Sequence, residues 1–191
     1  MRFLFIFLSL SAIACTNQSN QPNTSANTIK ADSLQATNTL AEHDTLPIDS
    51  AIVYIRTAFQ QINAAPLTHK DFKWTADNCN NDGTATYYFA SNNEIVKVVE
   101  TGAIGDGSWT TAYYYQGGKF IFSLQTDIGG PAIGPVDTIS VRKYVYADKV
   151  IRTIENDNYT TPADSLLTAT SKEYRILSAF KSKDFGSAFC D

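Results

Sequence analysis

The sequence has few of the residues on which catalytic and metal centres usually depend. Only two histidines occur among its 191 residues, His43 in a polar N-terminal segment and His69, and no C-x-x-C pair is present. A Ser-His-Asp or Cys-His device would have to use His69, with no G-x-S-x-G motif to support it. No pair of Cys or His has the spacing of a zinc site. We therefore expect no enzymatic activity, no metal and no cofactor.

Clusters of basic residues are also missing. The formal net charge is −4, and the longest basic run is Arg142-Lys143. Nucleic acids are bound largely through several Lys and Arg side chains that contact phosphates. We expect no nucleic-acid partner.

A largely apolar run from Phe3 to Leu10 follows Arg2 and precedes small residues. This run is too short to cross a bilayer, which needs about 20 apolar residues, but it has the length of the apolar part of a secretion signal. We therefore predict that residues 1–14 are a signal peptide.

The segment Leu10-Ser11-Ala12-Ile13-Ala14-Cys15 resembles the lipobox of bacterial exported lipoproteins. In that family the cysteine receives a diacylglyceryl group and becomes the mature N-terminus, which implies lipidation of Cys15. Ala12 stands where the family prefers Leu. An alternative is that Ala12-Ile13-Ala14 is an ordinary cleavage site that leaves Cys15 as a plain thiol. Through this region the chain is similar to small Gram-negative envelope lipoproteins, over less than a quarter of its length.

The resemblance implies a place in the cell envelope. The lipid on Cys15 would anchor the protein in the outer or inner membrane, facing the periplasm or the cell surface. Residues 15–47 are rich in Asn, Thr, Ser and Gln, and no aromatic residue occurs between Thr16 and Tyr54. Such a composition buries too little apolar surface to fold, so we predict a flexible tether that is followed by one domain over residues 48–191.

The cysteine count of three leaves an even pair if Cys15 is lipidated. In an oxidising compartment, Cys79 and Cys190 are then expected to form a disulfide. A disulfide that closes the loop of about 110 residues between them stabilises a domain by about 4–5 kcal/mol on the chain-entropy model. The alternative is two separate thiols, because sequence alone fixes no distance between them.

The pattern of apolar residues predicts an α+β domain. Helical spacing after Asp49-Ser50 indicates an N-terminal helix, and helical spacing after Asp164-Ser165 indicates a C-terminal one. Between them, the side-chain pattern repeats every two residues, as it does in strands. The strands form hairpin-like pairs joined by turns, namely 84–89 with 95–100, 109–115 with 119–124, and 139–146 with 150–155. We predict an antiparallel meander of six to seven strands, with both helices packed on one face.

Consecutive aromatic residues in the predicted strands give a first set of candidate binding residues. Because side chains alternate along a strand, Tyr114 faces away from Tyr113 and Tyr115, and Tyr88 is placed in the same way within its own strand. If helices cover only one face, Tyr88 and Tyr114 form an aromatic platform for a sugar or a protein partner. The alternative is that they are cross-strand pairs that stabilise the sheet.

The longest break inside the sheet, residues 126–137, gives a second set. It carries several glycines and prolines, with Asp127 and Asp137 near its ends. Long loops on a rigid sheet often bind ligands, so a site is expected there. The two carboxylates could also act as a glycosidase pair or be solvated loop acids.

These features together predict a non-enzymatic cell-envelope lipoprotein that serves as a binding or accessory module for a protein or glycan partner. Two alternatives stay open from the sequence. One is a hydrolase of envelope polymers that uses loop carboxylates, and the other is an inhibitor of secreted enzymes.

Overall fold

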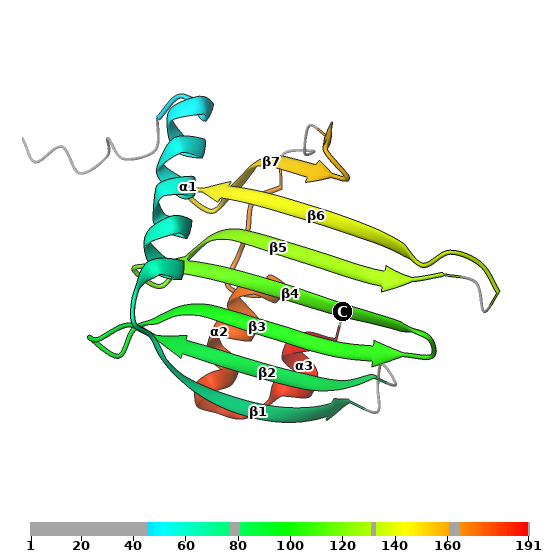
Figure 1. The fold of residues 1–191 in the computed structure, drawn as a ribbon. Coiled ribbons are helices and arrows are strands. Elements are labelled where there is room, and N and C mark those ends of the chain that lie inside the picture. Colours follow the sequence, from blue (N-terminus) through cyan, green and yellow to red (C-terminus); the bar gives the residue numbers. More distant parts are fainter. Residues whose placement is uncertain (1–45, 77–80, 131–132, 161–164, 191) are drawn as a thin grey trace, which may run out of the picture. The chain divides into compact units, whose positions relative to one another are not determined.

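Eight consecutive strands form one antiparallel sheet in chain order (Figure 1). The computed structural model describes residues 46–76, 81–130, 133–160 and 165–190. The strands are β1 (Thr68–Ala76), β2 (Asn81–Phe89), β3 (Ile95–Ile104), β4 (Gly107–Gln116), β5 (Lys119–Gly129), β6 (Asp137–Tyr146), β7 (Lys149–Glu155) and β8 (Asn158–Thr160). The predicted meander is confirmed, but the count of six to seven strands is wrong.

The additional strands lie at the two edges of the sheet. β1 begins at Thr68 and includes His69. β8 is only three residues long and pairs with the end of β7. In edge strands of this kind, apolar and polar residues alternate less clearly, because only one side of each strand is paired and few of its side chains are buried.

Tight turns explain why the strands follow chain order. Gly117 and Gly118 have φ values of 58° and 72°, and Ala147 and Asp148 have φ values of 50° and 61°. Positive φ at both central residues is the signature of the turn whose twist matches paired strands, so each strand folds back onto its predecessor.

Helices cover both faces of the sheet (Figure 1). α1 (Ile48–Ala64) packs on β5 and β6 on one face, while α2 (Lys172–Ser182) and α3 (Phe185–Phe189) pack on β3 and β1 on the other. The prediction that the helices share one face is therefore wrong. Tyr114 belongs to the apolar core beneath α1, and Tyr113 and Tyr115 belong to the core beneath α2 and α3. Both faces of the sheet are apolar, so a helix has to shield each of them from water.

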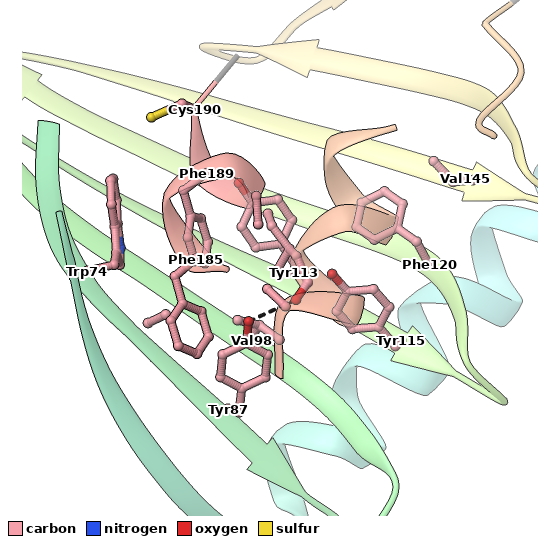
Figure 2. Close-up of a cluster of buried hydrophobic side chains, with 14 of the residues drawn as sticks. Trp74, Tyr87, Val98, Tyr113, Tyr115, Phe120, Val145, Phe185, Phe189 and Cys190 are labelled. Carbon is pink, nitrogen blue, oxygen red and sulfur yellow. Dashed lines mark hydrogen bonds between the residues drawn. The ribbon is translucent and has the colours of Figure 1, made fainter. Parts of the chain in front are cut away.

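Tyrosine hydroxyl groups attach α2 to the sheet. The hydroxyl group of Tyr87 donates to the backbone carbonyl of Ile176 at 2.8 Å, and that of Tyr115 donates to the carbonyl of Glu173 at 2.8 Å. Both tyrosines lie within the aromatic core drawn in Figure 2. A buried hydroxyl group needs a partner, so these bonds fix where the helix lies on the strands.

Both helix starts differ from the prediction. α1 begins at Ile48 with Pro47 as its N-cap, and Asp49 lies in the first turn. The C-terminal helix begins at Lys172, after Ser171, and not at Asp164-Ser165. Asp164 lies outside the described residues. The carbonyl of Ser165 accepts a hydrogen bond from Val150 N at 3.0 Å, so the start of β7 holds this segment extended.

The covalent features predicted from the cysteines stay predictions. Cys15 and Cys79 lie outside the described residues, as do the signal peptide and nearly all of the tether. Cys190 directly follows α3 and is buried. Beside it, the ring of Phe189 stacks on Trp74 of β1 with centroids 5.2 Å apart (Figure 2).

We expect the domain to lose stability steeply as the pH rises above about 10. Burial, followed by the charge of Glu100, raises the pKa of Tyr87 and of Tyr113 above the ordinary value, and burial raises that of Tyr115. The folded state therefore keeps protons that the unfolded chain releases, so stability is full below about pH 10 and falls above it. Each tyrosine contributes up to about 1.4 kcal/mol per pH unit to this loss. Urea unfolding between about pH 8 and 12 measures the slope.

The matched variant for this measurement is Tyr87→Phe, which lacks one of the three buried hydroxyl groups. Its free energy of unfolding should fall less steeply with pH than that of the wild type. A slope identical to that of the wild type, or unfolding that is independent of pH up to about 12, would contradict the assignment.

Candidate functional site

The four predicted binding residues fall on opposite faces of the sheet. Tyr88 and Tyr114 lie on the α1 face, in one cross-strand row with Lys97 between them. Asp127 and Asp137 lie on the face that carries α2 and α3. The structure therefore separates the two predicted sets, and they cannot form one site.

The aromatic platform expected on a face without helices is not formed, because α1 covers the face that carries Tyr88 and Tyr114. Tyr114 is only 3% exposed, because Phe59 of α1 packs on it with ring centroids 4.9 Å apart. Tyr88 is half-buried, and the Lys97 ammonium group lies 5.3 Å from the ring centroids of both tyrosines. Lys97 also donates to Asn63 of α1 at 3.0 Å. Tyr88 and Tyr114 thus help to hold α1 on the sheet, as cross-strand packing does.

Asp127 and Asp137 come together through strand register. β5 continues as far as Gly129, so the loop between β5 and β6 is shorter than the sequence indicated. In the paired strands Asp127 lies opposite Ile139, and Gly129 lies opposite Asp137. The two aspartates are therefore diagonal neighbours on one face, with a typical separation of about 7–8 Å.

These carboxylates line a groove of about 450 Å³ with Trp109 of β4. Trp109 lies directly opposite Asp127 in the pairing of β4 with β5. The other residues that line it are three glycines, two isoleucines and a serine, namely Gly107, Gly129, Gly130, Ile128, Ile139 and Ser108. The residues that line the groove come from the ends of β4, β5 and β6 that are remote from α1, and these strand ends lie at the right in Figure 1. Its volume is within the range of about 300–1,000 Å³ that small-molecule sites occupy.

The ring of Trp109 lies against Gly102 of β3. A Cβ atom added at Gly102 would be 2.2 Å from the ring, so no other residue fits beneath it. The same arrangement recurs at the other end of the row, where Trp74 lies over Gly83. In the row Trp74, Gly83, Gly102, Trp109, each large ring covers a glycine on the adjacent strand, which is a known way to stabilise glycine in a sheet.

Glu100 holds the indole of Trp109 in place from inside the core. Its side chain accepts hydrogen bonds from Trp109 Nε1 at 3.3 Å and from the Tyr113 hydroxyl group at 3.0 Å. Glu100 is only 3% exposed. Hydrogen bonds to a buried carboxylate are charge-assisted and directional, so they restrict the rotation of the indole ring.

No protein-family model, curated protein or solved structure matches this chain.

The sequence reasoning missed Trp109, Gly102 and Glu100. The predicted strand ended at Glu100, and no role was predicted for Gly102. Sequence offered one signal, since Trp109 and Gly102 lie symmetrically about the turn at Gly105-Asp106, which places them opposite each other in a hairpin.

The two aspartates of the groove can be compared with the carboxylate pair of a glycosidase. Their backbone spacing as diagonal neighbours, about 7–8 Å, is compatible with the carboxyl separation of about 6.5–9.5 Å found in inverting glycosidases. Asp137 is exposed and Asp127 is half-buried. In the described part of the chain, no three Asp, Glu, His or Cys side chains gather as a metal site would require.

We expect Glu100→Gln to destabilise the domain by about 1–3 kcal/mol, because the amide offers one acceptor oxygen where the carboxylate has two. One of the two buried donors, Trp109 Nε1 or the Tyr113 hydroxyl group, then loses its partner. Urea unfolding monitored by tryptophan fluorescence measures the change, and the folded-state emission of Trp109 should shift as its ring is released.

The control for this variant is Glu155→Gln, which neutralises an exposed glutamate at the end of β7. Its free energy of unfolding should stay within about 0.5 kcal/mol of the wild type. Equal stability of Glu100→Gln and the wild type would show that Glu100 does not hold the indole.

Proposed function

We propose that this protein is a non-catalytic lipoprotein of the cell envelope that binds a saccharide in the groove of Trp109, Asp127 and Asp137. The observation that carries the proposal is that β4, β5 and β6 bring an indole ring and two carboxylates to one groove. Of the partners considered from the sequence, a glycan agrees best with this combination.

Each part of the groove suits a sugar ring. The indole of Trp109 offers an apolar face against which the C–H face of a pyranose can pack. Carboxylate oxygens accept hydrogen bonds, and the hydroxyl groups of a sugar are donors arranged around the rim of its ring. The glycines allow a ligand to approach the backbone closely.

Anchoring by a lipid is the second part of the proposal. It rests on the lipobox-like segment that ends at Cys15 and on the polar residues that follow it. Among the described residues no helix has the length and apolar character to cross a membrane. A lipid on Cys15 would keep the domain at the membrane, with the tether setting how far the groove can reach.

A disulfide between Cys79 and Cys190 is the third part. Cys190 is buried at the end of α3, and α3 packs on β1. β1 ends at Ala76, three residues before Cys79 in the chain. The bond would tie the C-terminus to the edge of the sheet.

Binding of soluble tetrasaccharides, measured by calorimetry, tests the groove. The sharpest variant is Gly129→Leu, because a Cβ atom at Gly129 meets only the Cα atom of Gly107, at 3.9 Å. The leucine fills the groove without a backbone clash and should weaken binding at least about tenfold, or 1.4 kcal/mol. Trp109→Ala should weaken it as well, by removing the stacking surface.

The matched control is Thr138→Leu, which adds a leucine on the opposite face of the same strands. It should bind as the wild type does. The proposal fails if no glucose, N-acetylglucosamine or glucosamine tetramer binds, or if Gly129→Leu binds them unchanged.

Intact mass of the purified protein tests the covalent proposals together. We expect loss of residues 1–14, added acyl mass on Cys15, and a gain of two hydrogens on reduction of the Cys79–Cys190 bond. Cys15→Ser should prevent the acylation and leave the disulfide intact. A mature Cys15 without acyl mass, or two thiols that react before reduction, would contradict the corresponding part.

A further inference from the structure

The charge of the groove is of one sign. Among the described residues that line it, Asp127 and Asp137 are the only ones with ionisable side chains. Neither carboxylate forms an ion pair with a Lys or Arg within the described ranges. Two negative charges therefore face a shared space with no basic partner of their own.

The carboxylates also keep hydrogen-bonding capacity for a ligand. Asp127 accepts one bond through Oδ2, from the Gln125 side-chain amide at 2.7 Å. Asp137 accepts one through Oδ1, from the backbone N–H of Thr138 at 2.8 Å. In the part of the chain that the structure describes, Asp127 Oδ1 and Asp137 Oδ2 have no hydrogen-bond donor.

Trp109 makes an organic cation a better match than a metal ion. The face of an indole ring attracts ammonium groups, and it does so more strongly than the other aromatic rings. A divalent ion would take six or more oxygen ligands, and the described residues offer no third carboxylate at the groove. An ammonium group needs only two or three acceptors and an apolar or aromatic wall.

We infer that the ligand of the groove is an amino sugar with a free, protonated ammonium group. This inference rests on the proposed saccharide site and adds the charge of the ligand to it. The ammonium group donates to Asp127 Oδ1 and Asp137 Oδ2, while the pyranose ring packs on Trp109. Both contacts of the ligand use side chains that lie on one face of three adjacent strands.

Calorimetry with a matched pair of ligands tests the inference. The probes are the tetramer of β-1,4-linked glucosamine and the corresponding N-acetylglucosamine tetramer, measured at a pH of about 6, where the free amines are protonated. We expect the glucosamine tetramer to bind at least tenfold more tightly. The double variant Asp127→Asn, Asp137→Asn should remove this preference, and added salt should reduce it.

The double variant Asp82→Asn, Glu155→Gln is the control, because it removes two exposed carboxylates that do not line the groove, and so the same charge as the double aspartate variant. It should leave the preference for the glucosamine tetramer unchanged. This comparison separates the local effect of the groove from the effect of net charge on any cationic ligand.

The outcomes distinguish this inference from the proposed function. Equal binding of both tetramers, or binding of the glucose tetramer alone, would overturn the inference and leave the saccharide site standing, whereas binding of none of the three tetramers would overturn both. A preference that survives in the double aspartate variant would overturn the inference. Tetralysine binding more tightly than the glucosamine tetramer would also overturn it, in favour of a peptide ligand.

Discussion

The structure depends on one sheet that is apolar on both faces. Within β4, Tyr113 and Tyr115 face α2 and α3 while Tyr114 faces α1, and each side chain is buried. A sheet of this kind cannot leave either face in water, so it needs a helix on each. The tyrosine hydroxyl groups then determine where α2 lies, because each must find an acceptor inside the core.

The groove is the part of the α2 and α3 face that these helices do not fill. α3 packs mainly on β1 and α2 on β3, and the groove is lined from β4, β5 and β6. Trp109 connects the two regions, since it packs against the core and also lines the groove. Gly102 makes room for its ring and Glu100 holds its nitrogen, so the same residues that close the core also orient the groove's aromatic wall.

Local patterns predicted the strands and their order, because alternation and tight turns are encoded within a few residues. Alternation also predicted that Tyr114 faces away from Tyr113 and Tyr115, but not which helix covers each face, because that depends on contacts between helices and strands far apart in the chain. The predicted start of the C-terminal helix at Asp164-Ser165 was wrong for a related reason. Hydrogen bonds to the start of β7 hold Ser165 extended, and no local pattern reveals them.

The functional site shows the same difference between what local patterns predict and what depends on contacts between strands. Asp127 and Asp137 were found from the sequence as polar residues beside a glycine-rich break, but their meeting on one face follows from the register of β5 and β6. Trp109 was missed because its place depends on Gly102 across a hairpin. Tyr114 was misjudged because aromatic residues that stabilise a core and those that bind ligands look alike in sequence.

The most direct test uses the two tryptophans of the chain as opposite reporters. Trp74 is stacked on Phe189 inside the core, and Trp109 lines the groove. With ¹⁵N-labelled indoles assigned through Trp109→Phe, addition of the glucosamine tetramer should move the Trp109 signal in proportion to binding and leave Trp74 in place. A tetramer that binds while the Trp109 signal stays unchanged would contradict the groove as the ligand site.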